Sequence, residues 1–146
     1  MIDPRAQKLA NTLVHYCTDV QPGDWVLVRG HVVALPLVEE VVRAVTRAGG
    51  NPTVSLQSEG LEEAFLREAS AEQLGWLAPT EMLMAEQVDV RIAILGAHNT
   101  RSLTGMDPHK QQLQQRAQRT IRQTYMRRSA EGTHRWVGTL FPCPAY

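Results

Sequence analysis

The chain has 146 residues, and 43% of them are hydrophobic, which is typical of one globular domain with a core of its own. The formal net charge at pH 7 is zero, so charge does not indicate a nucleic acid or an anionic membrane as a partner. The longest apolar runs are far shorter than the ~20 residues of a membrane-spanning helix. Since no apolar leader precedes the first predicted helix, we expect a cytoplasmic protein.

A first helix is predicted from residue 4 to about residue 17. Asp3 is suited to its N-cap and Pro4 to its first turn, and apolar residues then recur at helical spacing. Cys17 continues this apolar face, so we expect a buried thiol in a reducing compartment. The second cysteine, Cys143, lies far away in the sequence.

A strand, a helix and a second strand are predicted next, within about thirty residues, which is the length of a βαβ unit. Residues 25–28 form a short apolar run typical of a strand buried on both faces, and residues 29–31 are expected to end it. Valines at helical spacing from 38 to 45 predict the helix, which the glycines at 49–50 terminate. Residues 53–57 predict the second strand, which should run parallel to the first.

Residues 59–89 are predicted to be mostly helical and are markedly acidic. Ser58 is suited to cap the first of these helices, residues 70–73 form a capping box, and Pro79 interrupts the pattern that follows. Arg67 is the only basic residue between 59 and 89. The acidic residues indicate either a solvated surface or an electrostatic contact with a basic partner.

A third strand is predicted at 88–95, and its two largely apolar faces suit a central position in a covered sheet. Asp107 and Pro108 then begin a helix that is expected to run to about residue 130. Its apolar stripe is narrow and basic residues lie along it, so we predict that it bridges domains or subunits, or pairs with an acidic surface. The candidate interface residues are Arg116, Arg119 and Arg122.

A last strand at 136–141 completes the predicted elements. The sequence therefore predicts one α/β domain over residues 1–146, with an open, mainly parallel sheet of about four strands and helices on both faces. The arrangement is Rossmann-like, but no dinucleotide-binding motif accompanies it.

No common motif for chemistry is present. The sequence has no HExxH, CxxC, GxGxxG, GxxxxGK[ST] or GxSxG pattern, so neither a metal site nor a nucleophile is predicted. Ligands of open parallel sheets bind at the carboxyl ends of the strands, where this chain carries polar residues. They form either a polar wall facing a ligand or domain, or ordinary loop surface. The candidate wall residues are Arg29, His31, His98, Asn99, Thr100 and Arg101.

Several blocks of sequence, in this order, resemble the N-terminal domain of the aminopeptidase T / aminopeptidase S family, the thermophilic metallo-aminopeptidases. The blocks are DPRAQKLANTLVHY, QPGDWVLVRG, ALPLVEEVVRAVTRAGGNP, EAFLREAS-AEQLGWLAP, NTRSLTGMDPHKQ and RWVGTLFPCPAY. They run along essentially the whole chain.

The resemblance implies a homodimeric exopeptidase that removes N-terminal residues from peptides with two divalent metals, zinc or cobalt. It also implies that the metal ligands lie in a C-terminal domain beyond this chain. No catalytic or metal-binding residue is therefore expected here, and no metal is expected to be bound by this chain. Asn99, Thr100 and Arg101 are then expected to line a cavity that another domain completes.

Two hypotheses follow. In the first, the chain is the N-terminal domain or a truncated form of a metallo-aminopeptidase, and it acts on peptides only when a catalytic domain is present. In the second, it is a non-enzymatic module that self-associates or binds a partner, with the basic helix at 107–130 against the acidic region at 59–89.

Overall fold

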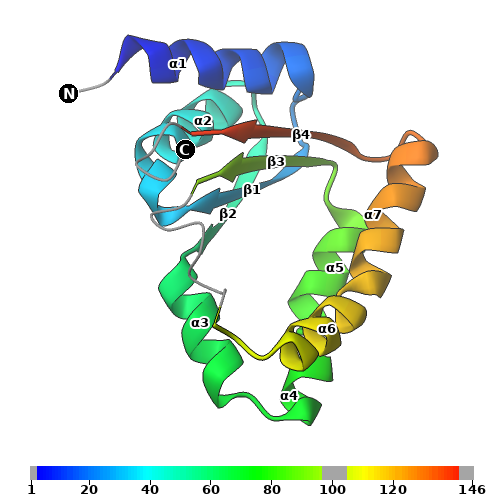
Figure 1. Ribbon diagram of the computed structural model, residues 1–146. Helices are drawn as coiled ribbons and strands as arrows, with labels where there is room; N and C mark the ends of the chain where they lie inside the picture. The colour runs from blue at the N-terminus through cyan, green and yellow to red at the C-terminus, as the bar shows by residue number, and fades with distance from the viewer. Residues whose placement is uncertain (1–2, 97–104, 142–146) are drawn as a thin grey trace.

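The computed structural model describes residues 3–96 and 105–141. In this part of the chain, four parallel strands form one sheet in the order β2-β1-β3-β4 (Figure 1). The strands are β1 (Trp25–His31), β2 (Asn51–Gln57), β3 (Val90–Leu95) and β4 (Arg135–Leu140). The predicted α/β class and open parallel sheet are confirmed. The strand order reverses between β1 and β3, and ligands of such sheets bind outside the carboxyl ends at this point.

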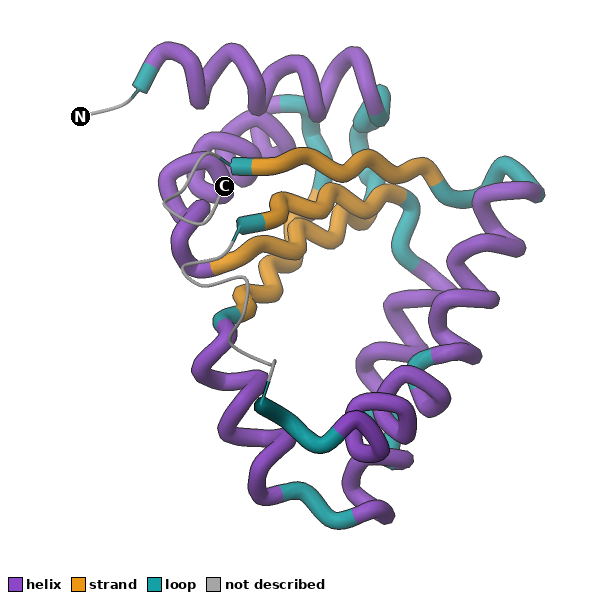
Figure 2. Tube along the Cα trace, viewed as in Figure 1, coloured by secondary structure: helices purple, strands orange, loops and turns teal. Residues whose placement is uncertain are grey.

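Helices cover both faces of the sheet, as predicted (Figures 1 and 2). α1 and α2 lie on one side, and α5 and α7 lie on the other. The helices are α1 (Pro4–Asn11), α2 (Leu35–Arg47), α3 (Glu59–Glu68), α4 (Ala71–Gly75), α5 (Pro79–Gln87), α6 (Pro108–Ala117) and α7 (Arg119–Ala130), with a π-helix η1 (Thr12–Cys17) and a 3-10 turn η2 (Val32–Ala34). No helix in the described ranges is long and apolar enough to span a bilayer.

The larger core lies between the sheet and the helices α1, η1 and α2. Val28 of β1, Ile92 of β3 and Val41 of α2 are fully buried in it. β-branched side chains suit this core because they pack well on a pleated surface.

The first strand is longer than predicted, because residues 29–31 continue it instead of ending it. They pair with Ser55 to Gln57 of β2, so their backbone belongs to the sheet. Gly30 fits there because helix α2 crosses close above it: a Cβ at Gly30 would lie 2.6 Å from Cγ2 of Val38. Arg29 therefore lies on a face of the sheet and not in a loop beyond it.

This close approach makes Gly30→Ala destabilising. We expect a loss of about 1–3 kcal/mol in the free energy of unfolding, since the added methyl group must displace α2 or distort the strand. Gly60→Ala is the control: Gly60 is exposed in the first turn of α3, and its nearest neighbouring atom, Oγ of Ser58, is 4.0 Å from the added Cβ. That variant should gain up to about 1 kcal/mol. Urea unfolding measures both variants. An unchanged free energy of unfolding for Gly30→Ala would contradict tight packing of α2 on β1.

Cys17 is exposed, and the prediction of a buried thiol is wrong. The chain leaves α1 as the π-helix η1, whose i→i+5 hydrogen bonds change which residues share a face. Thr18 takes the buried position at 1% exposure, and its hydroxyl donates to the carbonyl oxygen of Leu13 at 2.8 Å. Cys17 therefore gives no indication of the redox compartment.

The predicted basic helix is divided in two at Gln118, which has φ −75° and ψ −8°. The ψ angle departs from the helical value of about −42° and turns the axis. The side chain of Arg122 donates to the carbonyl oxygen of Gln115 at 3.0 Å beside this joint. As a result α6 packs against α4, and α7 packs against α5. Both contacts lie within this chain, and a role of these helices as a bridge to another domain or subunit stays a prediction.

On the side of α5 and α7, the sheet is covered only in part. Leu27 of β1 packs there with Ile121 and Tyr125 of α7. Farther toward β4 the same face carries an exposed apolar patch, which we call the β3–β4 surface. It consists of Leu95, Trp136 and Leu140, which are 53%, 57% and 57% exposed.

Candidate ligand-binding cleft

The helices α3 to α7 surround a cavity beside the sheet. α3 leaves the carboxyl end of β2, α5 and α7 lead to the amino ends of β3 and β4, and α4 and α6 lie between the far ends of these helices (Figure 1). The cavity has a volume of about 880 Å³ and is lined by residues of β1, β2 and all five helices. We call it the α3–α7 cleft. Its volume lies within the range of ~300–1,000 Å³ that is usual for ligand pockets.

Arg29 is the cationic group at the sheet end of the cleft. Its Nη2 lies 2.9 Å from Oε2 of Glu81 on α5, and the two side chains are 24% and 29% exposed. Its Nε is buried and has no hydrogen-bond partner among the described residues. Because a guanidinium carries five N–H donors, Arg29 keeps donors for a ligand while the ion pair holds it in place. Its position at the cleft is consistent with a polar wall that faces a ligand or an adjacent domain, and this role of Arg29 stays a prediction.

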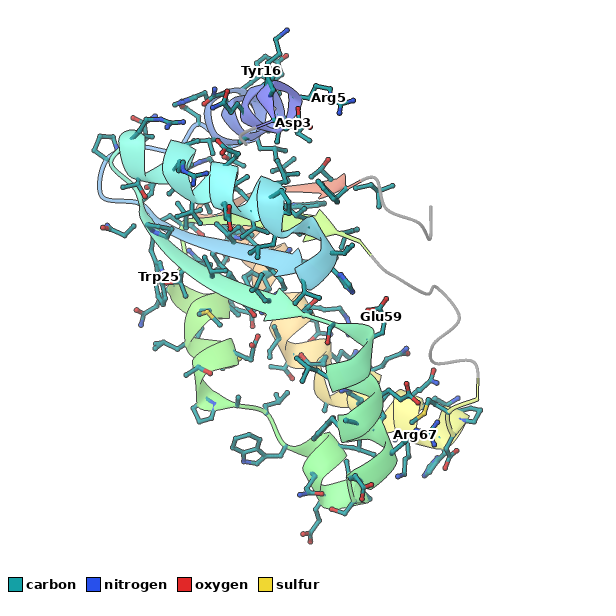
Figure 3. The ribbon with its side chains drawn as sticks, turned by 90° about the vertical axis from the view of Figure 1, so that its left-hand side faces the viewer. Asp3, Arg5, Tyr16, Trp25, Glu59 and Arg67 are labelled. Atoms are coloured by element: carbon teal, nitrogen blue, oxygen red, sulfur yellow. The ribbon has the colours of Figure 1, made fainter. Side chains whose placement is uncertain are left out.

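His31 has a different position from Arg29. Its Nδ1 accepts a hydrogen bond from the backbone N–H of Val33 at 3.0 Å, so the ring hydrogen lies on Nε2, which donates to Oε2 of Glu59 at 2.6 Å. Glu59 begins α3 directly after β2, as Figure 3 shows. His31 is 8% exposed and is not among the residues that line the cleft. Its contacts join the end of β1 to the start of α3.

The other predicted site residues are distributed as follows. Arg122 lines the cleft, whereas Arg116 and Arg119 are exposed and form no ion pair within the described part of the chain. Their role at an interface remains a prediction. The remaining candidate wall residues, His98, Asn99, Thr100 and Arg101, lie outside the described residues.

Most of the cleft is formed by residues that the sequence did not single out. Five glutamine side chains line it: Gln57, Gln73, Gln114, Gln115 and Gln118. Exposed Trp76 lies in the connection from α4 to α5. One sequence signal was available, because Gln114 and Gln118 are spaced one helical turn apart and so share a face.

A second polar cluster lies in the core between the sheet and α7. The guanidinium carbon of Arg91 is 4.2 Å from the centre of the Tyr125 ring, which in turn lies 5.1 Å from the ring of His134. Nδ1 of His134 is 2.9 Å from Oγ of Ser129. Burial, and then the positive charges of Arg91, Arg128 and Arg135, lower the pKa of His134 to about 4.

The lowered pKa of His134 predicts a loss of stability in acid. The unfolded chain protonates this histidine near its ordinary pKa of 6.5, whereas the folded protein does so only near 4. Between these values the unfolded state binds more protons, so the free energy of unfolding falls as the pH drops from 6.5 to 4, by on the order of 2 kcal/mol. The His134→Gln variant should lack this component. Urea unfolding from about pH 7 to pH 4.5 measures the free energy of unfolding of both proteins. If it fell equally with pH in the wild type and in His134→Gln, the prediction would be contradicted.

The described residues do not fit a two-metal site. Such a site needs several carboxylate or imidazole ligands on converging elements. Within residues 3–96 and 105–141, no group of three or more His, Cys, Asp or Glu side chains is arranged to hold a metal ion.

Comparison with known proteins gives two matches. The family model described as thermophilic metalloprotease (M29) matches residues 2–146. Among solved structures, the chain is similar to wild-type AmpT from Thermus thermophilus, with a TM-score of 0.78 and 23% sequence identity. That similarity covers 95% of this chain and 36% of the AmpT chain, so this chain spans about a third of AmpT. A search of curated proteins found no match.

Proposed function

Because the chain belongs to the thermophilic metalloprotease (M29) family, we propose that it is the N-terminal domain, or a truncated form, of a metal-dependent aminopeptidase. The observation that carries this proposal is the match of the family along residues 2–146 together with the 36% coverage of AmpT. In this proposal a further domain holds two divalent metals, zinc or cobalt, and removes N-terminal residues from peptides. The assembled enzyme is a cytoplasmic homo-oligomer.

The β3–β4 surface supports a contact with such a further domain. Leu95, Trp136 and Leu140 are all more than half exposed, and they lie on neighbouring strands at one edge of the sheet. Apolar patches on a folded domain are typical of contact surfaces. An adjacent domain packed there would cover the part of the sheet that α5 and α7 leave open.

Hydrolysis of leucine p-nitroanilide in the presence of zinc or cobalt tests the proposal. We expect no hydrolysis by the purified 146-residue chain. Activity should appear when the chain is linked to, or mixed with, the portion of an M29 relative that lies beyond the matched region. The proposal fails if the isolated chain binds two equivalents of zinc and cleaves the substrate.

The second candidate is a non-enzymatic module that self-associates through charged helices. One observation favours it: Arg116 and Arg119 are exposed, without a carboxylate partner among the described residues. Against it, the basic helices α6 and α7 already pack on the acidic helices α4 and α5 of the same chain. Light scattering at low and high salt tests this candidate, because a monomer in both conditions would exclude salt-sensitive association.

A further inference from the structure

The charges that line the α3–α7 cleft indicate a neutral ligand. Arg29 and Arg122 supply two guanidinium groups, and Glu62, Glu72 and Glu81 supply three carboxylates. A phosphate or polyanion placed in the cleft would meet at least as much negative as positive charge. Since Arg29 is paired with Glu81, and Arg122 stands against Glu62 and Glu72, the lining has no large excess of either sign. The cleft therefore favours a ligand that is polar but carries no large net charge.

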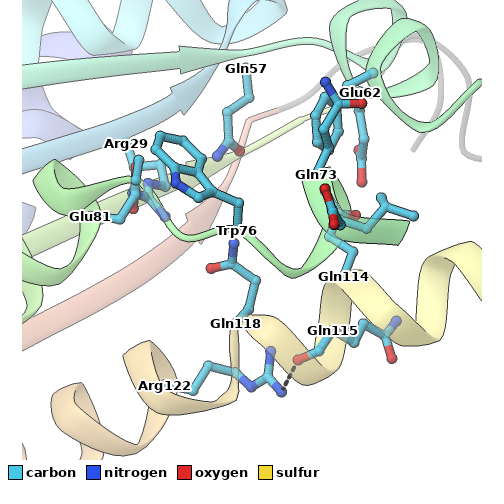
Figure 4. A pocket seen from close by; sticks show the side chains of 14 residues that line it. Arg29, Gln57, Glu62, Gln73, Trp76, Glu81, Gln114, Gln115, Gln118 and Arg122 are labelled. Atoms are coloured by element: carbon cyan, nitrogen blue, oxygen red, sulfur yellow. Dashed lines mark hydrogen bonds and ion pairs between the residues drawn. The ribbon is translucent and has the colours of Figure 1, made fainter. Parts of the chain in front are cut away.

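The most frequent polar groups in the cleft are primary amides. Figure 4 shows Gln57, Gln114 and Gln118 directed into the same space from the sheet, α6 and the α6–α7 joint. Gln73 of α4 also lines the cleft, but its Oε1 accepts a hydrogen bond from the backbone N–H of Ser70 at 2.9 Å. Each amide offers both a donor and an acceptor, which are the groups that a peptide unit also presents. Amides on opposite walls can therefore pair with the N–H and C=O groups of a main chain.

The distance between two of these glutamines along the helix matches the repeat of an extended peptide. Gln114 and Gln118 are four residues apart on one helical face, and a rise of 1.5 Å per residue separates them by about 6 Å. An extended chain presents groups on the same side every ~6.6 Å. One ligand strand lying along α6 would thus bring alternate peptide groups to both side chains.

Apolar groups lie among the amides. Trp76 is 68% exposed and Phe65 is 43% exposed, although both are large aromatic residues. Leu74, which also lines the cleft, is buried at 2% exposure in a small cluster with Leu66. Exposed aromatic rings beside convergent polar groups are typical of a site that receives apolar side chains.

We propose that the α3–α7 cleft binds an extended, uncharged peptide segment. The glutamine amides bond its main chain, and Trp76 and Phe65 contact its apolar side chains. This inference goes beyond the proposed function, because the binding needs neither a metal nor a further domain. It also assigns the peptide-binding role to residues of this chain.

The probe is an alternating Ala–Leu pentapeptide with an acetylated N-terminus and an amidated C-terminus. Since an aminopeptidase needs a free N-terminus, binding of this peptide is measured separately from hydrolysis. Titration into the 146-residue chain, followed by tryptophan fluorescence and by NMR chemical shifts, should show saturable binding in the micromolar to millimolar range. Shifts should concentrate at Trp76 and at the glutamine amides of the cleft.

Matched variants locate the site. The double variant Gln114→Ala/Gln118→Ala, and separately Trp76→Ala, should weaken binding by about tenfold or more. The control is Gln112→Ala/Gln123→Ala, which removes two exposed amides of the same helices that do not line the cleft. It should bind as the wild type does, and circular dichroism should show all the variants folded.

Three results would overturn the inference: no saturable binding, equal weakening by both double variants, or tighter binding of a neutral pentasaccharide than of the peptide. The last result would assign the cleft to carbohydrate, with Trp76 as a stacking platform. Each result is compatible with leucine p-nitroanilide hydrolysis by the assembled enzyme, so failure here is distinct from failure of the proposed function.

Discussion

Replacing Arg128 with alanine is expected to lower the free energy of unfolding by about 3 kcal/mol. Arg128 is 8% exposed although it lies on a helix rich in exposed arginines. Its Nη1 donates to the carbonyl oxygen of Ala85 at 3.0 Å, and its Nη2 donates to the carbonyl oxygen of Thr133 at 2.9 Å. The substitution leaves both oxygens without this charged donor, and burial near α5 limits their access to water.

Arg127→Ala is the control for this prediction. The neighbouring Arg127 has a side chain that is 63% exposed, and its Nε lies 3.7 Å from Oε1 of Glu131. Such surface ion pairs contribute little, so we expect a change of less than about 1 kcal/mol. Urea unfolding measures both variants. Equal losses would show that the buried hydrogen bonds of Arg128 stabilise the fold no more than the surface ion pair of Arg127 does.

Ile92→Ala is expected to cost about 3–4 kcal/mol, the largest effect that we predict. Ile92 is fully buried at the centre of β3, between Val28 of β1 and Val137 of β4 in the register of the sheet. The substitution removes three buried carbon atoms and leaves a cavity between the sheet and the helices α1 and α2, which pack on the other side chains of this core and can close around it only in part.

Leu95→Ala on the same strand is the matched control. Leu95 belongs to the β3–β4 surface and is 53% exposed, so its truncation should change the stability of the 146-residue chain by less than about 1 kcal/mol. Thermal and urea unfolding give both values. If Leu95→Ala cost as much as Ile92→Ala, the β3–β4 surface would be covered in solution, for instance by a second copy of the chain.

Much of the local structure was predictable because its signals are local. Asp3 caps α1, Ser58 caps α3, and Ser70 forms both hydrogen bonds of the predicted capping box. Each involves residues at most three positions apart. Apolar runs likewise predicted buried strands, and the short crossover through α2 predicted their parallel direction.

The helical spacing of apolar residues gave wrong predictions where the backbone departs from a regular α-helix. Cys17 would share a face with Leu13 in an α-helix, but the π-helix η1 gives that buried position to Thr18. The basic helix shows a similar limit of periodicity. Its apolar residues keep α-helical spacing on both sides of Gln118, so the sequence gives no sign of the turn there. Helical periodicity does not distinguish one continuous helix from two that meet at an angle.

The cleft was predictable only at its sheet end. Arg29 was singled out because polar residues at the end of a strand often face ligands, and it does line the cleft. Gln114 and Gln118 were not predicted as cleft residues, because polar residues at helical spacing usually indicate a solvated face. Their position in a cleft depends on α4, which packs against α6 from some forty residues earlier in the chain.

The sequence by itself determined the order and approximate extent of the helices and strands, and it carried the family resemblance that the M29 match confirms. Caps, turns and periodic apolar residues suffice for the segments because they act between near neighbours in the chain. Only the tertiary structure decided which faces meet. Arg128 is buried, and the cleft exists, because of contacts between residues such as Arg128 and Ala85 that are 43 positions apart. Such contacts depend on how the packed layers close around the sheet, and no local pattern records them.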